Sequence, residues 1–337
     1  MLGADRPNSC FPSRNPHNPG DTDKAQTSLL KFSCNKAIFK GPNGEAFMSR
    51  RNLVVVRAGD KSLHPYWLMG EGDRNWDLAV SYFGDDPDLF KTADVTRIDG
   101  KGPKWPGLHA VFAAHPEYLK NYDYILLPDD DLMASKDDIN RLFDICRAHG
   151  LEVGHPTLTW NSYFAHLITL RNVGTCLRYT NFVELMAPCL SAAMLERTWS
   201  YFAHTMSGWG LELAWEKLAR PMKMALIDDV TVHHTRPVGG PNYNALKDKG
   251  ISPSDEMLAF ARQMGFDKRI IEFYGADLAD GRRIDRAQRD RVFDFRMLWG
   301  WLPAFKETPD RRFLARRIAR YTYQTLRQIP DRVIEDG

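Results

Sequence analysis

The sequence predicts an α/β protein with a mostly parallel central sheet that is flanked by helices. Three observations favour this class: apolar strand-like runs alternate with helical segments, the strongest runs are continuously apolar, and polar residues follow directly after them. Residues 51–245 carry this pattern and form the predicted main domain. Residues 1–50, rich in Pro, Asn, Ser and Gly, are expected to be a poorly ordered leader, and residues 246–337 a helical C-terminal extension.

Strands and helices alternate through the first half of the main domain. Residues 52–57 (Asn-Leu-Val-Val-Val-Arg) and 76–83 are the first two predicted strands, and a short crossover helix begins between them at His64. Residues 108–120 have apolar side chains at helical spacing. Residues 125–127 (Ile-Leu-Leu) form the next strand, which ends before a proline because proline has no N–H for the sheet ladder.

A helix over residues 138–149, capped by Gly150 in the left-handed conformation, and a strand over residues 151–156 continue the alternation. The order predicts parallel strands joined by right-handed crossovers. Residues 164–170 and 181–187 are further strand candidates, with weaker signals.

The rest of the chain is less regular. Residues 191–204 predict a helix with Ser191 as its N-cap, and residues 212–219 predict another. Residues 223–227 and 230–233 are two strand candidates. The predicted helices of the extension cover residues 254–264, 285–299 and 310–328.

Three adjacent aspartates, Asp129, Asp130 and Asp131, follow the buried strand at 125–127. Ligands of open α/β sheets bind outside the carboxyl ends of the strands, which is where this triplet is expected. Neighbouring carboxylates repel one another unless water or a cation neutralises them, and oxygen ligands suit Mg²⁺ or Mn²⁺. An acidic turn that caps the next helix is the alternative, but the position after a buried strand favours a metal site.

Other charged residues near predicted strand ends are candidates for binding a nucleotide. Arg57 and Asp60 lie at the end of the first strand, and Asp85 follows the second. Lys101 and Lys104 flank a Gly-Pro turn, where lysine suits a diphosphate as a compact point charge. A solvated turn explains these two lysines equally well.

Further candidates lie in the second half of the chain. Glu184 is the one acid of the apolar segment Asn-Phe-Val-Glu-Leu-Met-Ala, and Glu212 opens a helix after Ser-Gly-Trp-Gly-Leu. N-terminal capping is the ordinary role of an acid in a first helical turn. His233 and His234 end a predicted strand, and Arg236 follows them.

Composition narrows the class of protein. The net charge of +2 gives no electrostatic signature of nucleic-acid binding, and we expect no nucleic-acid partner. No run approaches the roughly 18 apolar residues of a membrane span, and the N-terminus lacks a signal-peptide apolar region. The five cysteines show no CxxC spacing, so we expect free thiols and a cytoplasmic location.

Residues 311–328 combine arginines with an apolar stripe. A basic amphipathic helix of this kind can lie on the surface of an anionic membrane, as in a peripheral membrane protein. Covering the protein core with a solvated outer face is the favoured alternative.

In combination these motifs resemble the GT-A class of nucleotide-sugar-dependent glycosyltransferases. They are still more similar to an uncharacterised family of plants and bacteria, domain of unknown function 707, which in plants often bears the name "lysine-ketoglutarate reductase trans-splicing related". The shared motifs are the Tyr-Asp-Tyr-Ile strand with its acidic triplet, Phe-Val-Glu-Leu-Met-Ala-Pro at 182–188, Trp-Gly-Leu-Glu at 209–212 and Val-His at 232–233. No Gly-x-Gly-x-x-Gly follows the first strand, so the plant name does not suit these residues.

The resemblance implies that residues 51–245 are a GT-A-like catalytic domain, which moves a sugar from a nucleotide-diphosphate donor to a carbohydrate or other acceptor hydroxyl. Asp129 and Asp131 would then hold Mn²⁺ or Mg²⁺, with His233 as the third ligand. His233 is preferred to His234 because the plant proteins carry glutamine at the second position. Asp130 would support these ligands or face the ribose.

The same resemblance suggests roles for the remaining candidates. Lys101, Lys104 or Arg236 would assist with the diphosphate, and Glu212 would be the base of an inverting reaction. Glu184 is the alternative and would suit a retaining enzyme. A non-catalytic nucleotide-sugar or carbohydrate-binding protein of the same fold, and a metal-dependent nucleotidyltransferase or phosphohydrolase, are the competing hypotheses.

Overall fold

The computed structural model describes residues 51–238, 246–266, 271–287 and 291–327, together with the backbone of two short strands, β1 (Ile38–Lys40) and β2 (Ala46–Met48). These two strands pair with each other in antiparallel fashion. The rest of the expected leader, residues 1–50, lies outside the described residues.

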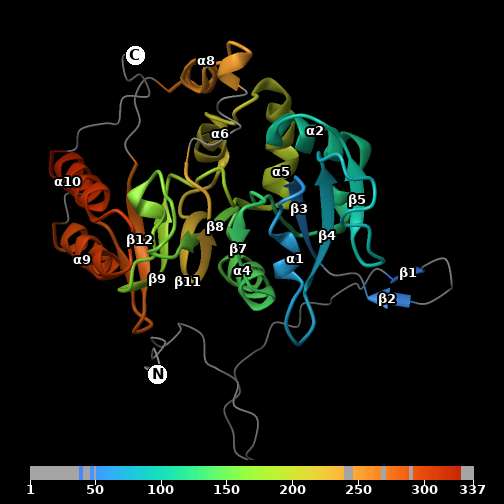
Figure 1. The fold of residues 1–337 in the computed structure, drawn as a ribbon. Coiled ribbons are helices and arrows are strands. Elements are labelled where there is room, and N and C mark those ends of the chain that lie inside the picture. Colours follow the sequence, from blue (N-terminus) through green and yellow to red (C-terminus); the bar gives the residue numbers. More distant parts are fainter. Residues whose placement is uncertain are drawn as a thin grey trace, which may run out of the picture.

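One large sheet organises the described part of the chain, with the strand order β5-β4-β3-β6-β10-β8-β11-β9-β12-β13 (Figure 1). The strands are β3 (Asn52–Ala58), β4 (Trp76–Tyr82), β5 (Thr96–Asp99), β6 (Tyr124–Leu126), β8 (Val153–Leu158), β9 (Thr175–Thr180), β10 (Cys189–Ser191), β11 (Met224–His234), β12 (Phe273–Leu278) and β13 (Arg283–Asp285).

Parallel pairing links β3 to β4 and β6, β4 to β5, and β8 to β11. Strand β10 lies antiparallel between β6 and β8, and β9, β12 and β13 extend the sheet beyond β11 by antiparallel pairing. A central α/β sheet flanked by helices is therefore confirmed, but the sheet is mixed: only its first part, β5-β4-β3-β6, is continuously parallel, contrary to the expectation of a mostly parallel sheet.

Helices cover both faces of this sheet. They are α1 (His64–Trp67), α2 (Lys104–Ala114), α3 (Tyr118–Asn121), α4 (Lys136–His149), α5 (Ala192–Thr198), α6 (Leu211–Leu218), α8 (Pro253–Met264), α9 (Arg291–Trp301) and α10 (Arg311–Arg327). Alternate residues of β3 face opposite sides: Val54 and Val56 join the core under α4, whereas Leu53 and Val55 join the core under α2, α5 and α6.

Two predicted strands are absent from the structure. Residues 164–170 contain a 3₁₀ helix (Leu167–Thr169) and only an isolated bridge from Leu170 to Leu158, while the carbonyl oxygens of Ile168 and Leu170 accept hydrogen bonds from Arg178. Residues 181–187 form a loop beside the aspartates, where the carbonyl of Met186 accepts a hydrogen bond from the Asp129 backbone N–H. Both segments bond to other parts of the chain, which apolar composition alone does not reveal.

The C-terminal stretch 246–337 is not purely helical as expected. Strands β12 and β13 lie within it, and β12 pairs with β9, about a hundred residues earlier in the chain. The two strands predicted at 223–227 and 230–233 are one strand, β11, with a register shift between Ile227 and Thr231. Antiparallel pairing over long sequence separations leaves no local pattern by which it could be predicted.

Two further expectations concern cysteines and membrane spans. Cys146 and Cys189 are buried free thiols, as predicted, whereas Cys176 is disulfide-bonded, contrary to the expectation of free thiols throughout. Within the described residues, none of the helices combines the length and apolar character that crossing a membrane requires.

Candidate functional site

The three aspartates lie in the loop between β6 and β7 (Leu132–Met133). β7 is a two-residue strand that pairs with the end of β11, where Met133 lies opposite His233 and Leu132 opposite His234. The carbonyl of Asp131 also accepts hydrogen bonds from the backbone N–H and side-chain hydroxyl of Thr235. This pairing joins the aspartate loop to the end of β11 at the carboxyl edge of the parallel strands.

Asp129 is paired with Lys104, the first residue of α2. The lysine Nζ lies 2.6 Å from Oδ1 of Asp129 and 2.8 Å from the carbonyl oxygen of Leu185. Burial raises the pKa of Asp129, and the positive charge of Lys104 opposes this rise. Lys104 is therefore at the site, as the sequence suggested.

Asp131 faces His234. Its Oδ2 lies 3.4 Å from Nε2 of His234, whose Nδ1 lies 2.7 Å from the carbonyl oxygen of Tyr163. Burial alone would lower the pKa of His234, but the hydrogen bond to Asp131 and its negative charge raise that pKa to about 9. Oδ1 of Asp131 is buried and has no hydrogen-bond partner.

His233, which was predicted as the ligand, does not face the aspartates. Its Nδ1 lies 3.1 Å from the Thr159 hydroxyl and 3.3 Å from the Ser162 hydroxyl. Successive side chains of a strand point to opposite faces, so only one of the two histidines can face Asp131. The structure brings His234 to the site in place of His233.

Asp130 connects two loops. Its Oδ2 accepts a hydrogen bond from the Gly59 N–H at 2.9 Å, and its Oδ1 accepts one from Arg236 at 3.1 Å. Arg236 also donates to the carbonyl of Lys61 at 2.7 Å. Asp130 and Arg236 thus fasten the loop after β3 to the residues beyond β11, and both lie beside the other aspartates.

The other predicted nucleotide-binding residues lie around the loops after β3 and β4. Arg57 is buried and donates to the Ser81 hydroxyl and to the carbonyls of Gly100 and Gly102 at 2.6–2.9 Å. The Asp60 carboxylate accepts a hydrogen bond from the Tyr82 hydroxyl. These contacts hold the local backbone, and the structure does not bring Arg57 to the aspartates.

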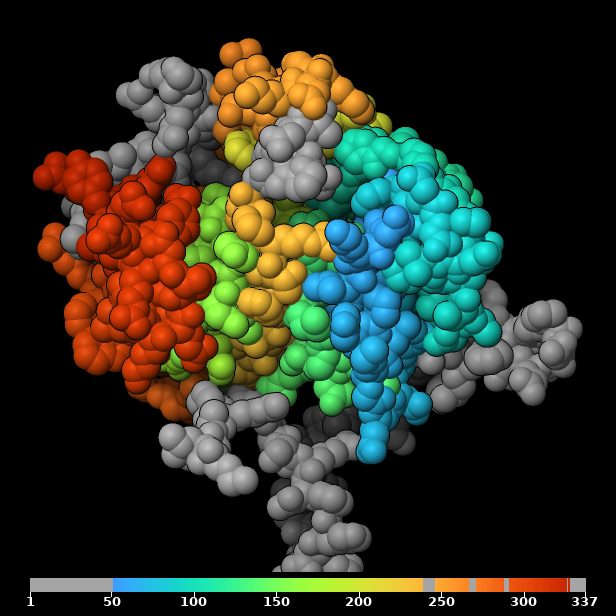
Figure 2. Space-filling view, in the orientation of Figure 1, coloured from blue at the N-terminus to red at the C-terminus, as the bar shows by residue number. Residues whose placement is uncertain are grey.

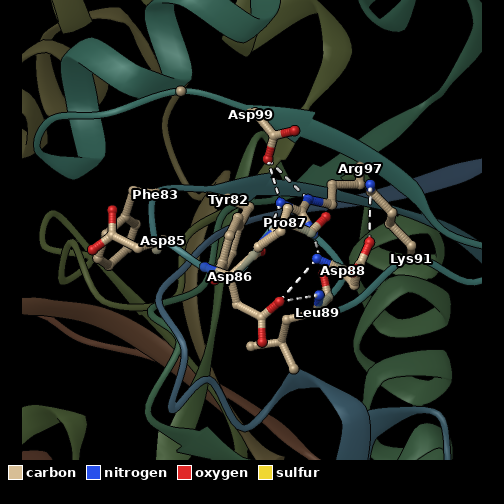
Figure 3. Close-up of polar contacts among 12 residues, drawn as sticks. Tyr82, Phe83, Asp85, Asp86, Pro87, Asp88, Leu89, Lys91, Arg97 and Asp99 are labelled. Carbon is tan, nitrogen blue, oxygen red and sulfur yellow. Dashed lines mark hydrogen bonds and ion pairs between the residues drawn. The ribbon is translucent and has the colours of Figure 1, made fainter.

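The loop after β4 is held by Arg97 of β5, which donates to the carbonyls of Asp86 and Pro87 and stacks on the Tyr82 ring (Figure 3). Asp85 lies apart from this network and pairs with Lys101, with Nζ and Oδ1 2.6 Å apart. Both side chains of this pair are exposed, and the hydrogen bonds of Lys101 go to Asp85 and to the carbonyls of Phe83 and Gly84 rather than to the three aspartates.

Two glutamates approach the aspartates from other segments. Oε2 of Glu184 is buried without a hydrogen-bond partner, and burial raises the pKa of Glu184 to about 7. The negative charges of Asp129 and Glu212 add to this rise. Glu212, in the first turn of α6, is buried and accepts a hydrogen bond from the Gly210 N–H at 3.1 Å. Glu184 therefore lies within electrostatic range of both Asp129 and Glu212.

Sequence reasoning missed the residue that holds the loop before α6. Glu256 of α8 accepts hydrogen bonds from the Thr205 hydroxyl, the Met206 N–H, and the N–H and hydroxyl of Ser207. Gly208 in the same loop has a φ of +86°, and a Cβ there would lie 1.9 Å from Nε1 of Trp105. No motif links Glu256 to this loop, because it lies about fifty residues further along the chain.

We expect Glu256→Ala to lower the free energy of unfolding by about 1–3 kcal/mol, because it leaves several partly buried donors without an acceptor. Urea-induced unfolding measures the change. Asp255→Ala is the matched control: this neighbour is in the first turn of the same helix, where an acid contributes only about 0.3–1 kcal/mol. Equal losses of stability in both variants would contradict the role of Glu256 in holding the loop before α6.

The side chains around the aspartates can be compared with the ligands that a divalent cation requires. Among the described residues, no group of three His, Cys, Asp or Glu side chains is arranged to hold a metal ion. Mg²⁺ and its analogues, however, usually bind through one or two carboxylates and take further ligands from substrate phosphates. Asp129 and Asp131 fit that pattern, and the unpartnered buried Oδ1 of Asp131 is the observation in its favour.

Comparison with known proteins supports the family resemblance over part of the chain. The family model described as a protein of unknown function (DUF707) matches residues 101–179, a stretch that contains Lys104 and the three aspartates. No curated protein sequence matches the chain significantly.

Among solved structures, S. aureus TarS 1–349 in complex with UDP-GlcNAc is similar at 13% identity and a TM-score of 0.48, and the similarity covers 64% of this chain and 65% of that 1–349 chain. GalNAc-T7 with UDP, GalNAc and Mn²⁺ is similar at 8% identity and a TM-score of 0.38, covering 62% of this chain and 50% of that one. A mycobacterial protein is similar at 12% identity and a TM-score of 0.40, and the similarity covers 73% of this chain and 90% of that one. The chain thus spans less than two thirds of the first and half of the second, and likenesses this weak carry no conclusion about activity.

Proposed function

We propose that this chain is a metal-dependent glycosyltransferase of the GT-A type, which transfers a sugar from a nucleotide-diphosphate donor to an acceptor hydroxyl. One observation carries the proposal: at the carboxyl edge of the sheet, two carboxylates of one loop each lie beside a basic side chain, Asp129 beside Lys104 and Asp131 beside His234. A third carboxylate, Glu184, lies close to Asp129, and Glu212 lies close to Glu184. The reaction requires carboxylates that bind a metal ion, a positive side chain that binds phosphate, and a carboxylate that transfers a proton.

Asp129 and Asp131 would hold Mn²⁺ or Mg²⁺, and His234 is the histidine beside them. When bound, the cation would neutralise the charge that grows on the departing nucleoside diphosphate. Lys104 and Arg236 add positive charge on either side of the aspartate loop. A diphosphate bound at this edge would offer Lys104 a second anionic partner in addition to Asp129.

Glu212 is our choice for the base that takes the proton of the acceptor hydroxyl. It lies at the start of α6, and hydrogen bonds to Glu256 hold the loop that precedes this helix. Glu184, with a pKa of about 7, is the alternative, since a group that titrates near neutral pH can accept or donate a proton. The two glutamates are separated by the variants described in the Discussion.

A donor site predicts stabilisation that requires both nucleotide and metal. We expect one of the UDP-, GDP-, dTDP- or CDP-sugars to raise the melting temperature with Mn²⁺ present, because a ligand at a hundredfold its dissociation constant adds about 2.7 kcal/mol. A thermal-shift screen of the purified chain measures this effect. The Asp131→Ala variant should lose the part of this stabilisation that depends on the metal. Donor binding by the wild type without metal would contradict the assignment of a metal site.

The same screen separates the competing functions. Stabilisation by nucleoside triphosphates but not by nucleotide sugars would favour a nucleotidyltransferase or phosphohydrolase. Donor binding without release of nucleoside diphosphate, with every acceptor class offered, would favour a binding protein of the same fold. No shift with any donor, in a protein that melts cooperatively, would overturn the proposed donor site.

A further inference from the structure

Helices α9 and α10 lie together at the end of the sheet beyond β12, opposite the edge formed by β5 (Figure 1). In the space-filling view they form one continuous margin of the molecule (Figure 2). On α9, Phe293, Met297 and Trp301 are buried in the core. The other side of the helix carries Phe295 and Trp299, which the proposed reaction does not use.

This outer side of α9 is apolar and exposed. Phe295 and Trp299 are each 64% exposed, and Leu302, at the end of the helix, is 45% exposed. The rings of Phe295 and Trp299 lie next to each other, with centroids 6.2 Å apart. The spacing of four and three residues places all three side chains on one face. Neighbouring large apolar groups in water mark an interaction surface more often than single ones do.

Positive charge is concentrated in the same two helices. Residues 291–327 contain nine basic and three acidic residues, a net charge of +6 against +2 for the whole chain. One of the three acids, Asp294, is buried and paired with Arg286. The exposed arginines of α10 are Arg311, Arg312, Arg316, Arg320 and Arg327.

We propose that the outer faces of α9 and α10 bind an anionic membrane surface, with Phe295 and Trp299 in the interfacial layer and the arginines of α10 against the lipid headgroups. Tryptophan favours the boundary between lipid and water because its ring is apolar and its N–H is polar. Anionic headgroups complement the +6 charge, whereas a second copy of this face would place two such charges against each other.

This proposal is compatible with the role expected for residues 311–328, which is to cover the protein core with one face of the helix. Leu314 of α10 is fully buried, so the helix covers the core on one side while its arginines remain in solvent on the other. The membrane contact therefore needs no rearrangement of the core. It is also independent of the proposed transferase chemistry.

Vesicle co-sedimentation tests the proposal with the full chain. We expect binding to phosphatidylcholine vesicles that contain about one third phosphatidylglycerol, and roughly tenfold weaker binding to pure phosphatidylcholine. The double variant F295S/W299S and the triple variant R312Q/R316Q/R320Q should each lose roughly tenfold on the anionic vesicles. The matched control Y66S/M69S removes two exposed apolar side chains at α1 and should bind as wild type does.

Melting curves show whether each variant is folded, so that lost binding is not mistaken for unfolding. Equal binding by wild type and F295S/W299S would overturn the assignment of this face. A wild type that ignores anionic vesicles but forms a dimer in light scattering, lost in F295S/W299S, would overturn it in favour of a second copy.

Discussion

Replacing Glu212 with glutamine is expected to lower turnover by about 10²–10⁴-fold while donor binding is retained, because a general base contributes a factor of that size. Glutamine keeps the side-chain oxygen that accepts the hydrogen bond from the Gly210 N–H, so the start of α6 should be preserved. Release of nucleoside diphosphate in the presence of acceptor measures the rate. The thermal shift with donor and Mn²⁺ measures binding in the same preparation.

Glu184→Gln is the matched variant, since Glu184 and Glu212 are carboxylates within electrostatic range of each other. If Glu212 is the base, the loss in Glu212→Gln should exceed that in Glu184→Gln. The reverse order would transfer the role to Glu184 and favour a retaining reaction. An unchanged rate in Glu212→Gln would exclude Glu212 as the base.

The position of the aspartate loop at the carboxyl edge of the sheet could be predicted because one rule of α/β sheets governs it. The buried strand at 125–127 and the acids after it were visible in the sequence, and ligands bind at the carboxyl ends of such strands. Lys104 and Glu184 come from segments that meet the same edge, and the structure brings both to Asp129. Asp129 and Lys104 lie next to elements that the local pattern predicts, a buried strand and a helix, whereas Glu184 lies in a loop where the sequence predicted a strand.

The choice between His233 and His234 could not be made in the same way. It depends on which face each side chain of β11 occupies, and a register shift between Ile227 and Thr231 alters the alternation before the strand reaches the site. Pairing with β7 then fixes His234 opposite Leu132. Neither the shift nor the pairing leaves a signal in the residue types.

Arg57 shows the opposite problem. A charged residue at a strand end suggested ligand binding, yet its partners are the carbonyls of Gly100 and Gly102, more than forty residues away in the sequence. Glu256 was overlooked for the same reason, because its partners in residues 205–207 are as distant. Side chains that bind backbone across such separations can be assigned only from the folded structure.

A second large effect is expected at Asp228, which is paired with Arg178 inside the protein with both side chains fully buried. Asp228 accepts hydrogen bonds from Arg178 Nε at 2.7 Å and Nη2 at 2.9 Å, and others from the Asn172 N–H and the Thr175 hydroxyl. Asp228→Asn should lower the free energy of unfolding by about 3–5 kcal/mol, because it leaves a buried guanidinium without its counter-charge. Urea-induced unfolding measures the loss.

Asp229 is the matched control, since it is the next residue in the chain and pairs with Arg141 at 2.9 Å, where the arginine is 31% exposed. Asp229→Asn should cost no more than about 1 kcal/mol, the usual contribution of a pair that water reaches. The double variant R178M/D228L should regain part of the loss, because it removes the unpaired charge together with its partner. If Asp228→Asn and Asp229→Asn cost the same, burial does not determine the contribution of the Arg178 pair, and the antiparallel end of the sheet depends on other contacts.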